Sequence, residues 1–439
     1  MADDDRQNPE DALRDMLRGL LGGDGGIDPA KLAGVAGLPS DPASVQQLIA
    51  QLQNAIRVDG TVNWDLAKQQ GQQLARKNSV ATTPGQVSGL EQAFHVAALW
   101  LDEATTVSEL TEVPELLGRA DWVRLTMPLW TQLAEPVASS IADALTAAMQ
   151  EQAPEEFASM IAGSTNMLRS IGGTLFALQL GQVVGQLAEE VVSGGDIGIP
   201  LLEDGVAALL PQNVAAFGEG LDIPADQVAL YLAVRELAHA RLFRQAKWLR
   251  LQVITSITEF ARGLRIDTDR MAELAEGFDP SNPEELREAL SSGAFIPPKT
   301  EAQLATLARL ETTLALVEGW VDVVTAAATA RLPKASAVAE TVRRRRASGG
   351  PAESAFATLV GLELRPRRLR EAAAMWQAVT DAVGYAARDE LWAHPDLLPD
   401  ASDIDDPSGL IAHLTALTSG QRTPQDDIDR ALDELLGGE

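Results

Sequence analysis

Apolar residues recur three and four positions apart along most of the chain, and this periodicity restricts the fold more than any other feature of the sequence. In one stretch Leu90, Phe94, Ala97 and Leu101 fall on a single helical face. Hydrophobic residues make up 46% of the 439 residues and aromatic residues only 4%, with Ala and Leu abundant, a composition that favours helix over strand. We therefore predict a mainly α-helical fold with at most a few short strands.

The Gly- and Pro-rich stretches indicate how the chain is divided. Residues 1–40 are acidic and contain GGDGG, which is typical of a flexible arm. Residues 41–420 are expected to form one mainly helical domain, and residues 421–439 a C-terminal helix or tail. Within the domain we predict helices at 43–56, 64–77, 87–103, 121–150, 154–192 and 225–245. A further helix follows to about 263, and others are predicted at 301–330 and 366–384, with one or two short strands near 205–210.

Charge and cysteine content exclude several classes of function. The formal net charge of −28 opposes binding to nucleic acid or to an anionic bilayer, because these partners repel an acidic surface. The absence of cysteine removes disulfides, thiolate zinc sites and cysteine nucleophiles. The first residues, MADDDRQNPEDALRDML, are acidic where a secretory signal is basic and then apolar. We expect a cytoplasmic protein that does not bind nucleic acid.

The stretch from 171 to 192, IGGTLFALQLGQVVGQLAEEVV, is the most membrane-like part of the sequence. Three glutamines and two glutamates interrupt it, so it falls short of an apolar span of about 20 residues. We expect no membrane span. We expect instead that Gly172, Gly181 and Gly185 allow close packing between helices.

One predicted helix carries a sequence close to a metal-binding motif. In YLAVRELAHARLF, residues 231–243, an H-E-x-x-H zinc motif is complete except that Arg235 stands at its first histidine. Tyr231, Arg235 and His239 would form one row at steps of about 6 Å along the helix, with Glu236 beside it. An E-x-x-H pair alone is frequent in helical proteins, so this segment by itself is weak evidence of zinc chemistry.

A second helix supplies a carboxylate in apolar surroundings. In LALVEGWVDVV, Glu318 lies among apolar residues, and Glu311 is two turns earlier on the same face. A buried carboxylate needs a cation or a hydrogen-bonding partner. Either a metal ion or Arg235 would satisfy Glu318.

Four segments together resemble a known family: VRELAHARLF, LVEGWVD, GLELRPRRLREAAAMWQAV and LWAHPDLLPDASDIDDP. They are similar to an actinobacterial family of zinc-dependent metalloproteases or hydrolases, one branch of which is associated with deazaflavin-coenzyme biosynthesis. The resemblance covers roughly residues 85–415 and implies a reduced glutamate-zincin (gluzincin) core. It also implies that Glu236 is the catalytic general base, His239 the second zinc histidine and Glu318 the third zinc ligand, with Arg235 in place of the first histidine.

The arginine opposes a catalytic zinc site. A catalytic zinc normally has three protein ligands, and the guanidinium of Arg235 stays protonated and so cannot supply one. We hypothesise that Arg235 takes the electrostatic place of the metal, donating to Glu318 or Glu236 and leaving His239 neutral. The protein would then be a non-catalytic or altered member of the family, binding or scaffolding a peptide or protein ligand.

The alternative is an active zinc-dependent metalloprotease that cleaves peptide bonds, which needs a substitute ligand. His95, His394 and His413 have no neighbour at ligand spacing. Tyr231 could bind a metal or stabilise an oxyanion, although packing in the core is the favoured interpretation, and Glu311 is the other auxiliary candidate.

The run from Arg343 to Arg346 is the strongest basic cluster. It could mark an anionic ligand, but we favour a solvated helix end seated against acidic neighbours.

Overall fold

A computed structural model describes residues 62–152, 173–174, 176–263, 299–347, 351–362 and 368–419. The predicted arm at 1–40, the predicted helix at 43–56 and the predicted tail at 421–439 lie outside these residues. The chain forms two compact units. The first comprises Met1–Gln70, Val137–Gln182 and Leu264–Pro298, and the second comprises Gly71–Pro136, Val183–Gly263 and Lys299–Glu439.

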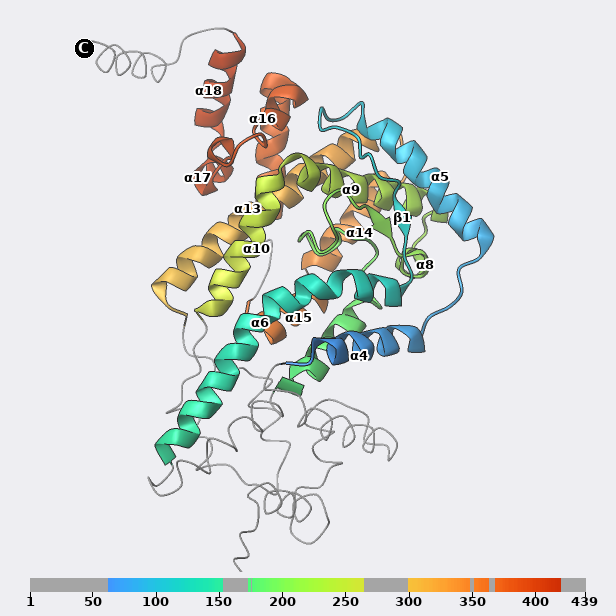
Figure 1. The fold of residues 1–439 in the computed structure, drawn as a ribbon. Helices are drawn as coiled ribbons and strands as arrows, with labels where there is room; N and C mark the ends of the chain where they lie inside the picture. Colours follow the sequence, from blue (N-terminus) through green and yellow to red (C-terminus); the bar gives the residue numbers. More distant parts are fainter. Residues whose placement is uncertain are drawn as a thin grey trace, which may run out of the picture. The chain divides into compact units, whose positions relative to one another are not determined.

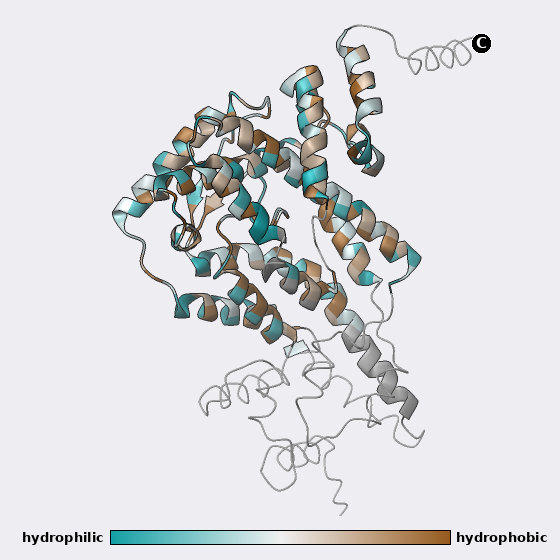
Figure 2. Ribbon diagram, turned by 180° about the vertical axis from the view of Figure 1, so that it is seen from behind, coloured by the Kyte–Doolittle hydropathy of each residue, from teal (hydrophilic) through white to brown (hydrophobic). Residues whose placement is uncertain are grey.

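Helices dominate the described residues, as the periodicity predicts (Figure 1). Figure 2 shows that they carry hydrophobic and hydrophilic residues together, as amphipathic helices do. The helices of more than ten residues are α4 (Trp64–Lys77), α5 (Pro84–Leu101), α6 (Arg119–Gln152), α9 (Ala225–Gln245), α10 (Lys247–Arg262), α13 (Glu301–Ala328), α14 (Ala335–Ala347), α16 (Leu369–Glu390) and α18 (Ser408–Thr418). The shorter ones are α8 (Pro211–Gly218), α15 (Pro351–Val360), α17 (Ala401–Asp405) and the 3₁₀ turn η2 (Pro395–Leu397).

Local capping explains where two of these helices begin. Thr83 and Gln86 form a capping box at the start of α5, and Thr300 and Gln303 form another at the start of α13. Each box satisfies backbone N–H groups that the first turn leaves without partners. Pro84 occupies the first turn of α5, so this helix begins three residues before its predicted start at 87.

Glycines bring helices of the first half into close contact, as the sequence predicts for two of the three positions. Residues 173–174 and 176–187 are helical. A Cβ atom at Gly181 would lie 2.4 Å from the carbonyl oxygen of Ala67 on α4. One at Gly185 would lie 3.0 Å from the carbonyl oxygen of Gly71. Gly172 lies outside the described residues. No helix in the described part of the chain is long and apolar enough to cross a bilayer.

Two short strands lie beside the motif helix. β1 (Glu115–Leu116) pairs in parallel with β2 (Ala208–Leu209), with Glu115 opposite Ala208. Ser193 forms an antiparallel bridge with Leu209 on β2. β2 falls within the predicted strand region, whereas β1 was not predicted, because two residues are too short to show an alternating pattern.

The motif helix α9 lies at the centre of the second unit. It packs against α5 and α13, with α8, α10, α14 and β2 as further neighbours. These neighbours cover α9, so that buried residues lie on every side of its middle turns. The bounds of α9 match the prediction of 225–245.

Helix α13 is fixed against α16 by a close approach and by tryptophan hydrogen bonds. A Cβ atom at Gly319 would lie 2.7 Å from the backbone nitrogen of Ala373. The indole of Trp376 donates to the carbonyl of Leu316 at 2.9 Å, and the indole of Trp320 donates to Asp389 Oδ1 at 2.9 Å. These contacts hold the turn of α13 that carries Glu318 in one position.

Candidate functional site

The candidate site is built on the middle turns of α9. Tyr231, Arg235 and His239 form the predicted row, one turn apart, and Glu236 lies beside it. All four residues are buried, with relative exposures between 1% and 5%. Because charged groups are rarely buried unless they are paired, Arg235 and Glu236 each require a partner within the protein.

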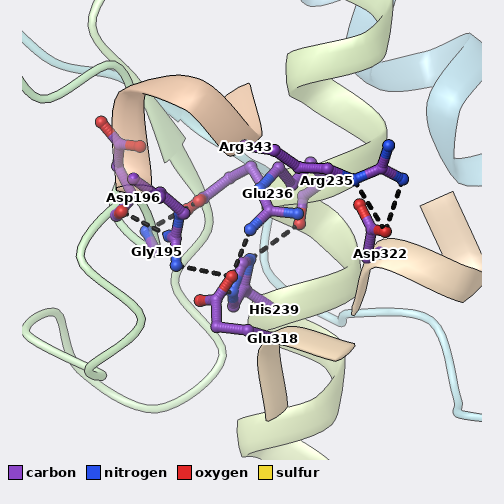
Figure 3. Close-up of polar contacts among 9 residues, drawn as sticks. Gly195, Asp196, Arg235, Glu236, His239, Glu318, Asp322 and Arg343 are labelled. Atoms are coloured by element: carbon purple, nitrogen blue, oxygen red, sulfur yellow. Dashed lines mark hydrogen bonds and ion pairs between the residues drawn. The ribbon is translucent and has the colours of Figure 1, made fainter. Parts of the chain in front are cut away.

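Glu318 on α13 is that partner for Arg235 and His239 (Figure 3). Arg235 donates to Glu318 Oε2, and His239 Nε2 lies 2.9 Å from Glu318 Oε1. The structure thus brings together Arg235, His239 and Glu318, three of the four residues that the sequence predicts for one site. Of the two acceptors considered for Arg235, it selects Glu318.

A second arginine, Arg346 at the C-terminal end of α14, completes the surroundings of Glu318. Its Nη1 lies 2.5 Å from Glu318 Oε2, the oxygen that also accepts from Arg235. Burial acts to raise the pKa of Glu318, but the charges of Arg346 and Arg235 outweigh it and hold that pKa well below its usual range. Glu318 is therefore an ionised carboxylate with both oxygens occupied.

The two arginines respond differently to burial. Burial acts to lower the pKa of Arg235, but the attraction of Glu318 outweighs it and the pKa is raised. For Arg346 burial is the larger effect and the pKa is lowered, in part because Arg235 is nearby. Both remain guanidinium ions, given the very high ordinary pKa of this group.

His239 faces acceptor oxygens with both ring nitrogens. Nδ1 lies 3.1 Å from the carbonyl oxygen of Arg235, and Nε2 faces Glu318. The neutral ring expected from the sequence has one N–H and can donate to only one of these oxygens, whereas an imidazolium would donate to both. In either form the ring is committed to these contacts.

Glu236 is directed away from Glu318, toward the backbone of the neighbouring loop and strand. Its Oε2 accepts from the N–H of Gly195 at 2.8 Å, and its Oε1 from the N–H of Ala208 at 2.9 Å. Burial raises the pKa of Glu236, against the opposing effect of these hydrogen bonds and of one from Ser193. These contacts hold the carboxylate against the backbone of the loop and the strand, as in a structural acceptor.

The two auxiliary candidates lie next to this cluster. Tyr231 is 1% exposed, and burial raises its pKa to about 12, so the phenol is neutral and packed in the core. Glu311 is half-buried on α13, two turns before Glu318. The partners of Glu318 come from α9 and α14, so the functional interpretation of Glu311 stays a prediction.

The arginine run is only partly the solvated helix end that the sequence suggested. Arg344 fits the expectation, with a side chain that is 78% exposed and paired with Glu340. Arg343 pairs with Asp322 at 2.7 Å, and Arg345 with Asp196 at 3.1 Å. Arg346 is only 11% exposed, so for this residue the expectation of a solvated side chain is wrong. The role of Arg346 was not predictable from the sequence, because its position against Glu318 depends on the packing of α14.

The donor set at this site does not fit a catalytic zinc ion. Such an ion requires three protein ligands. Here the possible ligands are His239 and Glu318, and the other side chains at Glu318 are two guanidinium groups, which cannot coordinate a metal ion. His239 and Glu318 also contact each other directly at 2.9 Å, closer than the roughly 3.4 Å that separates two ligands of a tetrahedral zinc. Within the described residues, no group of three His, Cys, Asp or Glu side chains could hold a metal ion.

Comparison with known proteins places the chain in a family. The sequence profile of the zincin-like metallopeptidases matches residues 62–411, which include α9, α13 and α14. The chain belongs to this zincin-like metallopeptidase family. Zincins usually hold zinc. No match to the chain was found among curated proteins.

The chain also shares its fold with a solved structure. A protein from Chloroflexus aurantiacus, described as a candidate hydrolase with a novel fold, has 19% sequence identity with this chain and a TM-score of 0.54. The similarity covers 80% of this chain and 98% of the other. At this identity the comparison establishes a shared fold, and function has to be argued from the site itself.

Proposed function

We propose that this zincin-like protein works without a catalytic zinc and binds or scaffolds a peptide or protein ligand. The observation that carries the proposal is the complete occupation of Glu318. One oxygen accepts from Arg235 and Arg346, and the other faces His239. Two fixed positive charges thus lie where a dication would have to bind, and they oppose it electrostatically.

The position of Glu236 supports the same conclusion. The carboxylate that the family resemblance makes the general base is held by the backbone N–H groups of Gly195 and Ala208. Hydrolysis of a peptide bond needs this group to polarise a water molecule. With its oxygens engaged in this way, the side chain stabilises the fold next to the site.

The ion pairs explain why the site persists without catalysis. Arg235 connects α9 to α13, and Arg346 connects α14 to α13. Removal of one partner from such a buried pair costs about 3 to 5 kcal/mol, because the other charge is left without compensation. Selection for stability would therefore retain these residues in a protein that binds a ligand. The cysteine-free composition is compatible with the cytoplasmic location that we propose.

Metal content is the measurement that tests the proposal. Untagged protein, purified without chelator, is analysed by elemental mass spectrometry before and after incubation with a modest excess of zinc. We expect no stoichiometric zinc in either sample and no effect of chelator on thermal stability. About one zinc per chain, retained through gel filtration, would contradict the proposal.

The second candidate function is an active zinc-dependent metallopeptidase. The facing arrangement of His239 and Glu318 favours it, since these are the two ligands that the family resemblance retains. This function requires Arg235 and Arg346 to withdraw and another residue to complete the site. Peptide hydrolysis that chelator abolishes and zinc restores would establish it.

A further inference from the structure

The loop formed by residues 193–198, SGGDIG, lies directly on the candidate site. A Cβ atom at Gly195 would lie 2.9 Å from the Cβ of His239, and one at Gly198 would lie 2.7 Å from Glu318 Oε1. One at Gly194 would lie 2.8 Å from Glu236 Oε1. The backbone of the loop is therefore in contact with side chains from both helices of the site, and no larger residue fits at these positions.

Backbone hydrogen bonds hold the first half of the loop against β2 and α9. The N–H of Gly194 donates to the carbonyl of Ala208 at 2.9 Å, and the N–H of Gly195 donates to Glu236 at 2.8 Å. Just before the loop, the carbonyl of Val192 accepts from the N–H of Leu210 at 2.9 Å. The loop thus covers this edge of β2 as an added strand would.

Two arginines from α14 hold the second half of the loop. Arg345 Nη1 lies 3.1 Å from Asp196 Oδ2, and Arg345 also donates to the carbonyl of Glu190. Arg346 donates to the carbonyl of Asp196 and pairs with Glu318. Asp196 in turn accepts from the N–H of Val192 at 2.9 Å. The end of α14 therefore joins the loop to the buried cluster.

We propose that residues 193–198 are an autoinhibitory plug over the Arg235–His239–Glu318 cluster and that Arg345 and Arg346 are the latch that keeps it closed. A ligand reaches the cluster when the latch opens and the plug swings away. This inference rests on the proposed function, in which the protein binds a peptide or protein ligand, and it assigns that ligand to the cluster. It adds that access to the site is controlled from α14.

The residues of the plug and latch suit a local movement. Gly198 has a φ of +81°, and together with Gly194 and Gly195 it gives the loop backbone freedom that other residues lack. The Arg345–Asp196 pair is partly exposed, at 28% and 13%, so solvent screens it and its rupture requires far less than global unfolding. Opening at this pair leaves α9 and α13 packed.

A single engineered thiol can report the opening, because the chain has no cysteine. Ser193 is 7% exposed and is close in size to cysteine, so Ser193→Cys places the thiol at the buried first residue of the plug. The full chain with this substitution is labelled with a small water-soluble disulfide reagent, and the rate is measured. The latch variant adds Arg345→Gln, which leaves the partners of Glu318 untouched. The matched control adds Arg344→Gln, since Arg344 lies on the exposed side of the same helix.

We expect Arg345→Gln to accelerate labelling by about tenfold or more, since the reagent reacts only with open molecules. Arg344→Gln should label at the rate of the Ser193→Cys parent. An unchanged labelling rate in a folded Arg345→Gln variant would refute the proposal that Arg345 keeps the plug closed.

Hydrogen exchange, measured on chains without the cysteine, separates local opening from general destabilisation. With Arg345→Gln, amides of residues 193–198 should exchange faster while those of α5 and α16 keep their wild-type rates. Equal acceleration in all segments would mean global destabilisation and would refute the plug. Zinc content does not enter either measurement, so a failure of the latch is distinguishable from a failure of the proposed function.

Discussion

Arg235 and Glu318 are 83 positions apart in the chain and form a buried ion pair between α9 and α13. Their side chains are 7% and 1% exposed. The family resemblance implied zinc ligands at the positions of these two residues. In this protein the contact between the two helices is instead an ion pair made by the protein's own side chains.

Loss of this pair should destabilise the fold. We expect Arg235→Ala to lower the free energy of unfolding by about 3 to 5 kcal/mol, because Glu318 loses one of its compensating charges. Denaturant titration followed by circular dichroism measures the change. Arg344→Ala is the control and should change stability by less than about 0.5 kcal/mol, as expected for an exposed side chain. An Arg235→Ala variant as stable as the control would refute the structural role of the pair.

Zinc affinity should require changes at both arginines. Arg235→His creates the ligand set that the family resemblance implies, but Arg346 still occupies Glu318 Oε2. We therefore expect Arg235→His alone to bind zinc weakly, and the Arg235→His/Arg346→Met double variant to bind it at least about tenfold more tightly, since one opposing charge is removed. Isothermal titration calorimetry compares the two. Equal affinities would show that Arg346 does not compete with the metal.

Glu236 should prove to be a structural residue. Glu236→Ala leaves the N–H groups of Gly195 and Ala208 without their acceptor, which should cost about 2 to 4 kcal/mol of stability. Glu236→Gln keeps one oxygen acceptor and should cost less. Thermal unfolding of the two variants gives the comparison. A stable Glu236→Ala variant that had lost a peptidase activity would instead support the catalytic role.

Alkaline titration should separate the two tyrosines. Burial raises the pKa of Tyr231 to about 12 in the folded protein, whereas an unfolded chain ionises near the ordinary value of about 10. Because the pKa of Tyr231 is higher in the folded than in the unfolded chain, its contribution to the free energy of unfolding is complete below pH 10. This contribution falls by about 3 kcal/mol in total as the pH rises from 10 to 12.

The chain contains two tyrosines, and Tyr385 is 44% exposed, so Tyr385→Phe leaves Tyr231 as the only phenol. Tyrosinate absorbance of that variant should appear only near pH 12, together with unfolding. Ionisation near pH 10 with the fold intact would contradict the burial of Tyr231.

Helix positions were largely predictable from sequence because they depend on local periodicity. The prediction of 64–77 matches α4, and that of 225–245 matches α9. The row of Tyr231, Arg235 and His239 follows directly from helical geometry. Helix α16 extends to Glu390, past the predicted end at 384, because Gly384, with a φ of +83°, produces a kink and a further helical segment follows it.

The pairing of side chains across the fold was only partly predictable. The need of Glu318 for a cation followed from its apolar neighbours, and Arg235 was one of two candidates considered. Two other contacts depend on packing between distant segments, which one sequence does not encode as a local pattern. One is the contact of Arg346 with Glu318, and the other is the hydrogen bond that Glu236 accepts from a backbone N–H group. The run of arginines at the end of one helix was the only feature of the sequence that pointed to the contact of Arg346.

The tryptophans around α13 give the site an intrinsic optical reporter. Trp320 lies two residues after Glu318, donates to Asp389 and meets the ring of Trp392 edge-on, with ring centroids 6.3 Å apart. Trp376 stacks on Trp392 from the other helix. Indole emission depends on the polarity around the ring. Movement of the Glu318 turn should therefore shift the fluorescence of the unlabelled protein and make the state of the site readable in solution.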